Sequence, residues 1–274
     1  MAKRVLITGA GSGIGLATAR LLAKRGYRVY GGVRKEADAQ ALAQEGITPI
    51  FLDVTREEDL KRAREALGEG LYGVVANAGV AVAGPLELVP PAAFRQALEV
   101  NVLGAFATVK AFLPLLRQAR GRVVLMGSVS GLVALPLMGP YAASKFALEA
   151  LADALRVELA PFGVRVVLVE PGSVATPIWE RSLRAAEAYL EPPPPGTEGV
   201  YGRYLDLARC MARRSAQRGL FPERVAEAVL RALESPNPKA RYLVAHPARV
   251  RETLLLRLLP TPWRDRLLGR FLGV

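Results

Sequence analysis

Residues 8–15 read Thr-Gly-Ala-Gly-Ser-Gly-Ile-Gly and lie between an apolar run and an amphipathic segment. Glycine allows a tight turn and lets main-chain N–H groups approach a phosphate closely. A helix that begins directly after the turn would direct its positive end at a pyrophosphate. A glycine turn without a ligand has the same composition, but the apolar run before it and the helical pattern after it favour a dinucleotide site.

Short apolar segments alternate with helical segments over the first 170 residues. These apolar segments contain little polar alternation, which is typical of strands that are buried on both faces of a parallel sheet. The pattern predicts an α/β fold with a doubly wound Rossmann-type sheet, whose ligands bind at the carboxyl ends of the strands. Strands are predicted at residues 4–8, 28–32, 48–52, 73–76, 122–126, 164–169 and 241–245, and helices at 14–24, 57–67, 102–117, 141–159 and 222–234.

One catalytic domain is predicted over residues 1–247, because the alternating pattern resumes at 222–245 after an interruption. The interruption, residues 172–221, contains no predicted strand and is divided by a run of prolines at 192–195. A long insert at the ligand-binding edge of a sheet is either a binding lid or a disordered loop. We interpret this one as a substrate-binding lid.

A basic amphipathic extension is predicted at residues 248–274. Residues 203–274 carry a net charge of +9, whereas residues 1–202 carry +3. Such a segment can lie on an anionic membrane surface, but packing on its own domain or on another subunit is the expectation here. Its apolar positions are Val250, Leu254, Leu255, Leu258, Trp263, Leu267 and Phe271.

The composition excludes several kinds of site. One cysteine, Cys210, excludes an internal disulfide framework, and one histidine, His246, argues against histidine-based zinc sites or a Ser-His-Asp triad, so no metal is expected. The low cysteine content fits a reducing compartment, and we expect a cytoplasmic protein. Glycines and prolines interrupt the apolar stretches 1–22 and 123–144, so neither is predicted to span a membrane. No recognition motif accompanies the positive charge, and nucleic-acid binding is not expected.

Tyr141 and Lys145 are four residues apart at the start of a predicted helix, so their side chains share one face. Half-ionising a phenol with a pKa of about 10 at pH 7 requires roughly 4 kcal/mol. One cation at about 4 Å and an effective dielectric near 20 supplies about that much. We therefore expect Lys145 to activate Tyr141 as a general acid and base. Ser128, at the end of a predicted strand, is the candidate to hold the reacting oxygen, and its neighbour Ser130 is not.

These motifs together resemble the short-chain dehydrogenase/reductase family, in the style of its hydroxysteroid and retinol dehydrogenase branch. The resemblance covers residues 3–177 and rests on the glycine turn, Asn77-Ala-Gly79, Asn101, the Ser128 to Lys145 region and Pro171-Gly172. It implies an oxidoreductase of a carbonyl and an alcohol, a homo-oligomer (dimer or tetramer), and Asn101 in a distorted helix. By the same resemblance, the catalytic residues are Asn101, Ser128, Tyr141 and Lys145. The residues implied to bind the cofactor are Gly9, Ser12, Gly13, Ile14, Gly15, Asp53, Val54, Asn77, Ala78, Gly79, Tyr141, Lys145, Pro171, Gly172, Val174 and Thr176.

The choice of nicotinamide cofactor depends on the end of the second predicted strand. A carboxylate there would bind the ribose of NAD, whereas a cation would bind the 2′-phosphate of NADP. Arg34 and Lys35 follow this strand and no acid ends it, so NADP(H) is preferred over NAD(H). The two bases could also be ordinary solvated loop charges.

The expected substrate is a small hydrophobic carbonyl compound or alcohol. The side chains assigned to it are Val80, Ser128, Leu135, Met138 and Trp179, which are mostly apolar and follow the predicted strand ends. Packing of the loops is the alternative role for each of them. A non-catalytic nucleotide-sensing or membrane-associated interaction protein is the alternative function, although such a protein has no need of Ser128, Tyr141 and Lys145 together.

Overall fold

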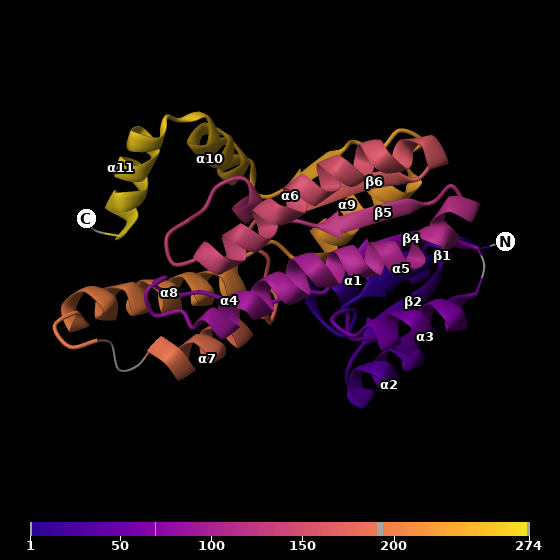
Figure 1. Ribbon diagram of the computed structural model, residues 1–274, viewed down its shortest axis with the longest axis horizontal. Helices are drawn as coiled ribbons and strands as arrows, with labels where there is room; N and C mark the ends of the chain where they lie inside the picture. The colour runs from indigo at the N-terminus through magenta and orange to yellow at the C-terminus, as the bar shows by residue number, and fades with distance from the viewer. Residues whose placement is uncertain (1, 69, 191–193, 273–274) are drawn as a thin grey trace.

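The computed structural model describes residues 2–68, 70–190 and 194–272 and is shown in Figure 1. The first two prolines of the predicted proline run and the side chain of Phe271 lie outside the described part. Seven parallel strands form one sheet in the order β3-β2-β1-β4-β5-β6-β7, which confirms the predicted doubly wound fold. The strands are β1 (Arg4–Thr8), β2 (Arg28–Val33), β3 (Thr48–Phe51), β4 (Leu71–Ala76), β5 (Arg122–Met126), β6 (Arg165–Pro171) and β7 (Arg241–Val244).

β2, β3 and β7 differ from their predicted bounds by one residue each. β4 and β6 each extend by two residues at one end, because neighbouring strands extend their pairing. β4 begins at Leu71, before the predicted residue 73, because Leu71 pairs with Arg4 and a register shift follows. β6 continues to Pro171, where Glu170 and Pro171 pair with the last residues of β7. This extension matters for the site, because it carries Pro171 to the carboxyl edge of the sheet.

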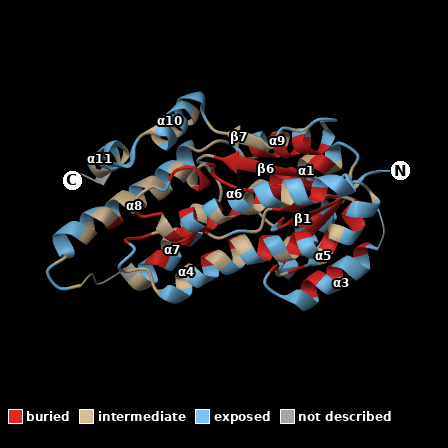
Figure 2. Ribbon diagram, turned by 45° about the horizontal axis from the view of Figure 1, so that its top comes forward, coloured by how far each residue is buried: buried red, intermediate tan, exposed pale blue. Residues whose placement is uncertain are grey.

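Helices cover both faces of the sheet (Figures 1 and 2). One face packs against α1 (Gly13–Lys24), α2 (Glu36–Gln44) and α9 (Pro222–Glu234). The other face packs against α3 (Glu57–Leu67), α5 (Gly104–Gln118) and α6 (Gly139–Leu159). Within β1, Val5 and Ile7 join the first cluster and Leu6 joins the second, and all three are fully buried. Burial on both sides explains why the strand sequences lack polar alternation.

A continuous helical segment runs from Pro91 to Gln118 and is the one described helix that is long and apolar enough to span a membrane. It consists of α4 (Pro91–Leu98), a π-helical turn η1 (Glu99–Leu103) and α5. Phe112 and Leu116 of α5 are fully buried against the sheet. Its apolar character therefore matches the packing of a core helix.

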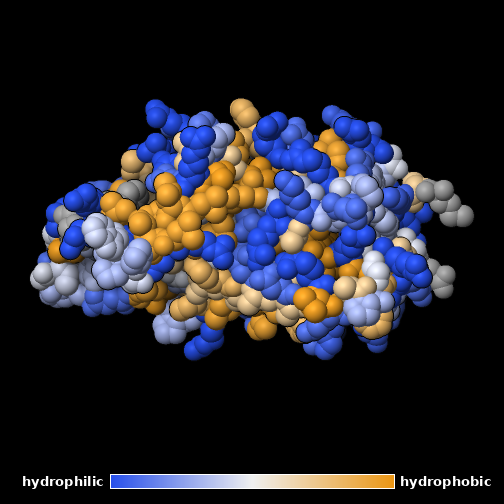
Figure 3. All heavy atoms as spheres, turned by 90° about the horizontal axis from the view of Figure 1, so that it is seen from above, coloured by the Kyte–Doolittle hydropathy of each residue, from blue (hydrophilic) through white to orange (hydrophobic). Residues whose placement is uncertain are grey.

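The insert and the C-terminal extension form helices at one end of the molecule (Figure 1). The insert holds α7 (Ile178–Leu190) and α8 (Glu198–Arg218), which pack on each other, and the extension holds α10 (Pro247–Leu258) and α11 (Thr261–Leu272). Part of the apolar stripe is not covered by its own domain, because Leu255 is 63% and Leu258 81% exposed. The other expected arrangement, packing on another subunit, stays a prediction. Apolar residues gather on this end of the molecule in Figure 3. A different face of α10, with Arg249, Thr253 and Leu256, lines a cavity of the domain.

Candidate active site

The glycine turn lies between the end of β1 and the start of α1, at the carboxyl edge of the sheet. Gly9 and Gly13 have positive φ angles of 66° and 56°, a conformation that side chains disfavour. A Cβ on Gly15 would lie 2.3 Å from the Gly9 carbonyl oxygen, so only glycine fits there. Ser12 precedes α1 in an extended conformation without a side-chain cap, and the first turn of α1 has no acid. The positive end of α1 is therefore open to an anion, as a pyrophosphate site requires.

Thr8 ties the glycine turn to the loop that follows β4. Its Oγ1 accepts hydrogen bonds from the main-chain N–H groups of Asn77 and Ala78, both at 3.0 Å. The Asn77 side chain returns hydrogen bonds from Nδ2 to the carbonyl oxygens of Thr8 and Gly9, at 2.9 and 3.2 Å. These contacts bring the predicted cofactor segments 9–15 and 77–79 together. Thr8 was not among the predicted site residues, although it opens the glycine motif.

Asn101 lies inside the π-helical turn η1 and is almost fully buried. Its Oδ1 accepts a hydrogen bond from Val80 N at 2.8 Å, and its Nδ2 donates to Val80 O and to Ser144 Oγ, both at 2.9 Å. Ser144 Oγ in turn donates to Tyr141 O at 2.7 Å. The helix is distorted at the position where the family resemblance implied a distortion. Ser144, like Thr8, was not among the site residues predicted from the sequence.

Ser128, Tyr141 and Lys145 meet at the end of β5 and the start of α6. Ser128 Oγ accepts from Ser130 N at 3.1 Å, and the Ser128 side chain lies close enough to the Tyr141 phenol to lower its pKa. Lys145 Nζ lies 5.5 Å from the centre of the Tyr141 ring and donates to Met126 O at 2.8 Å. Trp179 packs edge to face against the Tyr141 ring, with the two ring centres 6.3 Å apart. The phenol, hydroxyl and amine are thus held together in one buried cluster.

Burial shifts the pKa values of both Tyr141 and Lys145 in this cluster. Burial raises the pKa of the Tyr141 phenol above its usual value, and the hydrogen bond with Ser128 only partly offsets this effect. Burial also lowers the pKa of the Lys145 amine to about 8. The low-dielectric site disfavours both charges. Activation of Tyr141 by Lys145, with the charge of an oxidised nicotinamide ring adding to it, stays a prediction.

The loop after β6 closes the edge of the site. Pro171 O accepts from Ser128 Oγ at 3.4 Å, and Gly172 N donates to Val244 O at 2.9 Å. A Cβ on Gly13 would lie 3.0 Å from the Thr176 methyl group, so Thr176 packs against the glycine turn. Val174 is buried, and its carbonyl oxygen accepts from Trp179 Nε1 at 3.1 Å. The predicted residues after β6 therefore lie beside both the glycine turn and Ser128.

Charges of both signs lie near the residues that were predicted to bind the adenosine half of the cofactor. Arg34 follows β2, has a side chain 68% exposed, and pairs with the Asp53 carboxylate at 3.4 Å. Burial opposes ionisation of Asp53, but hydrogen bonds from Thr55 and Arg34 outweigh it and lower the Asp53 pKa. Asp38, in the first turn of α2, has a carboxylate oxygen 2.6 Å from where a Cβ on Gly11 would be. One acid thus lies against the glycine turn.

Lys35 and Val54 have different surroundings. Lys35 is exposed and precedes α2 in an extended conformation. Val54 is buried, and a Cβ on Gly104 would lie 2.6 Å from its Cγ2. Val54 therefore packs the loop after β3 onto the start of α5.

An active-site cavity of about 510 Å³ opens from Ser128 toward the helices of the insert and the C-terminal extension. Ser128, Leu135, Met138 and Trp179 line it, as expected for substrate-contacting residues. Val80 does not: its main chain holds Asn101 instead. The lining also includes residues of α8 and α10 that the sequence reading did not assign, among them Leu205, Met211, Arg214, Arg218, Arg249 and Leu256.

A family model described as short chain dehydrogenase matches residues 3–187. The chain belongs to the short-chain dehydrogenase/reductase family of oxidoreductases. It is 40% identical over 252 residues to 17-beta-hydroxysteroid dehydrogenase type 1 of Homo sapiens, an alignment that covers 87% of this chain and 76% of the relative. It is 37% identical to the uncharacterized oxidoreductase YbbO of Escherichia coli K12, over 98% of this chain and 94% of the relative. A solved short-chain dehydrogenase from Burkholderia cenocepacia, in complex with NADP, is 28% identical with a TM-score of 0.72, covering 94% of this chain and 98% of that one.

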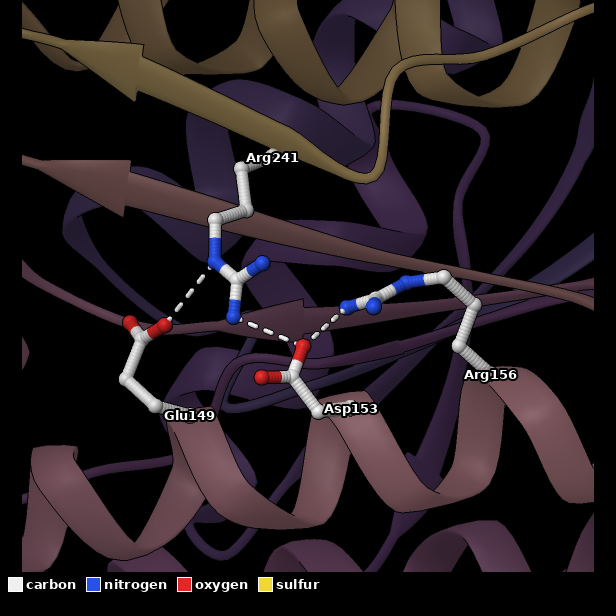
Figure 4. A network of polar contacts seen from close by, with 4 residues as sticks. All are labelled: Glu149, Asp153, Arg156 and Arg241. Atoms are coloured by element: carbon white, nitrogen blue, oxygen red, sulfur yellow. Dashed lines mark hydrogen bonds and ion pairs between the residues drawn. The ribbon is translucent and has the colours of Figure 1, made fainter.

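In this member of the short-chain dehydrogenase/reductase family, a polar network supports α6 behind the site (Figure 4). Arg241 of β7 binds Glu149 at 3.1 Å and Asp153 at 2.7 Å, and Arg156 binds Asp153 at 2.8 Å. Burial, followed by the neighbouring Glu149 carboxylate, raises the pKa of Glu170 to about 8. The network fixes α6, and therefore Tyr141 and Lys145, against the end of the sheet.

Proposed function

We propose that this protein is an NADP(H)-dependent oxidoreductase that interconverts a hydrophobic carbonyl compound and its alcohol. The observation that carries the proposal is the buried cluster of Ser128, Tyr141 and Lys145, with Ser128 lining a mostly apolar cavity and Lys145 one helical turn from Tyr141. General acid–base work requires a proton donor within hydrogen-bond reach of the reacting oxygen. Ser128 lines the cavity, so a substrate oxygen that binds beside Ser128 lies near the Tyr141 phenol.

The residues present fit a dinucleotide. The glycine turn forms a cradle that a Cβ at Gly15 would fill, and the open positive end of α1 suits a pyrophosphate. The loops at 77–79 and 171–176 would flank the nicotinamide half, and Asp53 with Val54 would flank the adenine. When bound, the reduced nicotinamide supplies the hydride for the carbonyl carbon, and its oxidised form takes one from the alcohol carbon.

The chain's own residues move the proton and hold the oxygen. Tyr141 donates its phenolic proton to the carbonyl oxygen in the reduction and accepts the alcohol proton in the oxidation. Ser128 donates a hydrogen bond to the same oxygen as negative charge develops on it. Lys145 stabilises the resulting phenolate, because its amine is held in place by Met126 O. Asn101 positions the loop after β4 through Val80 and thereby maintains the pocket wall.

The preference for NADP(H) is supported by the cation directly after β2, since a cation there would bind a 2′-phosphate. Arg34 directly follows β2, and its guanidinium matches the geometry of a phosphate. The solved relative from Burkholderia cenocepacia is in complex with NADP. The Asp38 carboxylate near Gly11 would repel a phosphate and so opposes this preference. Binding of NADPH therefore has to be compared with binding of NADH.

Tyr141→Phe tests the chemistry. The variant keeps the ring that packs on Trp179 and loses only the hydroxyl, so it should bind NADPH as the wild type does. Reduction of a panel of hydrophobic aldehydes and ketones, followed by NADPH absorbance, should fall by at least about a thousandfold. A wild type that turns over no member of a broad panel would instead favour the non-catalytic alternative.

The proposal also includes predictions about the oligomeric state, the location and the membrane contact of the protein. A dimer or tetramer in the cytoplasm is expected, and light scattering of the purified protein measures the assembly. Peripheral membrane contact would use the exposed apolar side chains of α10 and α11, including Leu255, Leu258 and Trp263. Sedimentation with anionic vesicles, compared between wild type and Leu255→Glu, tests that contact.

A further inference from the structure

The active-site cavity has an apolar interior and a charged mouth. Apolar side chains dominate among the buried and half-buried members of its lining, including Leu137, Met138, Ala186 and Leu205. The exposed members mark the mouth and are mostly polar or charged: Ser173, Glu187, Arg214, Arg218, His246, Arg249 and Glu252. A ligand that fills this cavity therefore meets apolar groups near Ser128 and charged groups near the opening.

The charge of the lining is positive. Four arginines (209, 214, 218 and 249) face two glutamates (187 and 252), a net formal charge of +2. Arg249 already pairs with Glu252 at 2.5 Å, and Arg209 pairs with Asp206 at 3.5 Å. These two arginines therefore have partners within the protein.

Arg214 and Arg218 differ from the other two arginines. They lie four residues apart on α8 and so share one face of the helix. Among the described residues, neither has an ion pair or a side-chain hydrogen bond, although both line the cavity. A guanidinium fork binds carboxylates and phosphates through paired N–H groups. Two such forks at the mouth of an apolar cavity suit an oxyanion on the ligand.

We infer that the substrate is an amphiphile, with its carbonyl or alcohol at Ser128 and a carboxylate or similar oxyanion at Arg214 and Arg218. This inference rests on the proposed function and names its substrate class. The apolar part of the molecule fills the cavity between these ends. The cavity volume of about 510 Å³ accommodates a medium-length chain or a small ring system.

Two substrates that differ only in the anion provide the test. With NADPH and the full-length enzyme, kcat/KM is measured for 12-oxododecanoic acid and for its methyl ester. The acid should be favoured by about tenfold or more, and the Arg214→Gln/Arg218→Gln double variant should lose this preference. Arg213→Gln is the matched control, because Arg213 is exposed on α8 and does not line the cavity. It should keep the preference.

A binding measurement separates this inference from the proposed reaction. Calorimetric titration with dodecanoate, which cannot be reduced, should show binding to wild type that the double variant weakens about tenfold and Arg213→Gln preserves. Equal turnover of acid and ester, or an unchanged ratio in the double variant, overturns the inference and leaves the proposed function standing. Dodecanoate binding that depends on Arg214 and Arg218, without turnover of either aldehyde, supports the anion site and counts against the proposed function.

Discussion

Asn101 and Val80 form a reciprocal pair of hydrogen bonds. Asn101 Oδ1 accepts from Val80 N at 2.8 Å, and Asn101 Nδ2 donates to Val80 O at 2.9 Å. An amide side chain carries a separate acceptor oxygen and donor nitrogen, so it can accept and donate at the same time. The π-helical turn η1 is thereby fastened to the loop after β4, which carries Asn77-Ala-Gly79.

Replacing this amide should destabilise the fold. Asn101→Ala leaves the Val80 N–H and C=O groups without their partner, and the expected loss in the free energy of unfolding is about 2–4 kcal/mol. Urea unfolding followed by circular dichroism measures it. Asn101→Asp retains an acceptor for Val80 N but cannot donate to Val80 O when ionised, so it should be destabilised as well. A change below about 0.5 kcal/mol for both variants would contradict the role assigned to the pair.

The hydrogen bond with Ser128 lowers the pKa of Tyr141, so its removal should change the pH dependence of alcohol oxidation. Oxidation needs the phenolate and therefore rises with pH. In Ser128→Ala the Tyr141 pKa increases, so the rise should move to higher pH, and kcat should fall by about 10- to 100-fold. Ser130→Ala is the control and should leave the profile in place. An unshifted profile in Ser128→Ala would rule out this coupling.

Glu170 should make the protein less stable at alkaline pH. Its pKa in the folded protein is raised to about 8 from 4.5, so the folded state binds the proton more tightly than the unfolded state. Its stabilising contribution is complete below pH 4.5 and is lost as the pH rises toward 8. Glu170→Gln should therefore gain stability relative to wild type between pH 5 and pH 9, by about 1–3 kcal/mol. Urea unfolding at several pH values measures this, with the exposed Glu158→Gln as control; parallel curves for Glu170→Gln and wild type would contradict it.

Two glycines should respond in opposite ways to alanine. At Gly15 a Cβ would lie 2.3 Å from the Gly9 carbonyl oxygen, so Gly15→Ala should lose about 1–3 kcal/mol of stability and weaken NADPH binding. At Gly202, within α8, a Cβ meets nothing within 4 Å. Gly202→Ala should gain about 0.5–1 kcal/mol from helix propensity and leave NADPH binding unchanged. Thermal unfolding measures the stability of both variants, and titration measures their NADPH binding. Equal changes in Gly15→Ala and Gly202→Ala would refute the steric argument.

Arg34 should discriminate between the two nicotinamide cofactors. Arg34→Gln removes the cation beside Asp53 and should weaken NADPH binding by about tenfold or more while NADH binding changes little. Calorimetric titration with each cofactor measures the difference, and Arg25→Gln at the exposed end of α1 is the control. Tighter binding of NADH than NADPH by the wild type would reverse the cofactor assignment.

Local sequence signals predicted most of the sheet and the residues at its carboxyl edge. The apolar runs at β1 and β5 carry their own strand signal, and both were placed with the bounds that the structure has. The Tyr141 to Lys145 spacing depends only on helix geometry. These features follow from neighbours in sequence, and a periodic pattern can reveal them.

Features that depend on distant segments were not predictable in the same way. Leu71 belongs to β4 because it pairs with Arg4, and no local pattern indicates that pairing. Burial raises the pKa of Tyr141, and burial is a property of the assembled site. Arg214 and Arg218 line the cavity only because α8 folds back beside the sheet edge, whereas their sequence resembles any basic helix.

The helix α6 places Tyr141, Lys145, Glu149 and Asp153 at successive intervals of four residues. The rise of a helix is about 1.5 Å per residue, so these groups occupy roughly 18 Å of a single rod. One end of the rod holds the Tyr141 phenol, and the other is anchored to β7 by Arg241. A rigid element that is anchored at a distance transmits small axial displacements along its whole length. In the proposed reaction, charges that do not touch the substrate would therefore help to align the phenol with it, and the last strand of the sheet would contribute to this alignment.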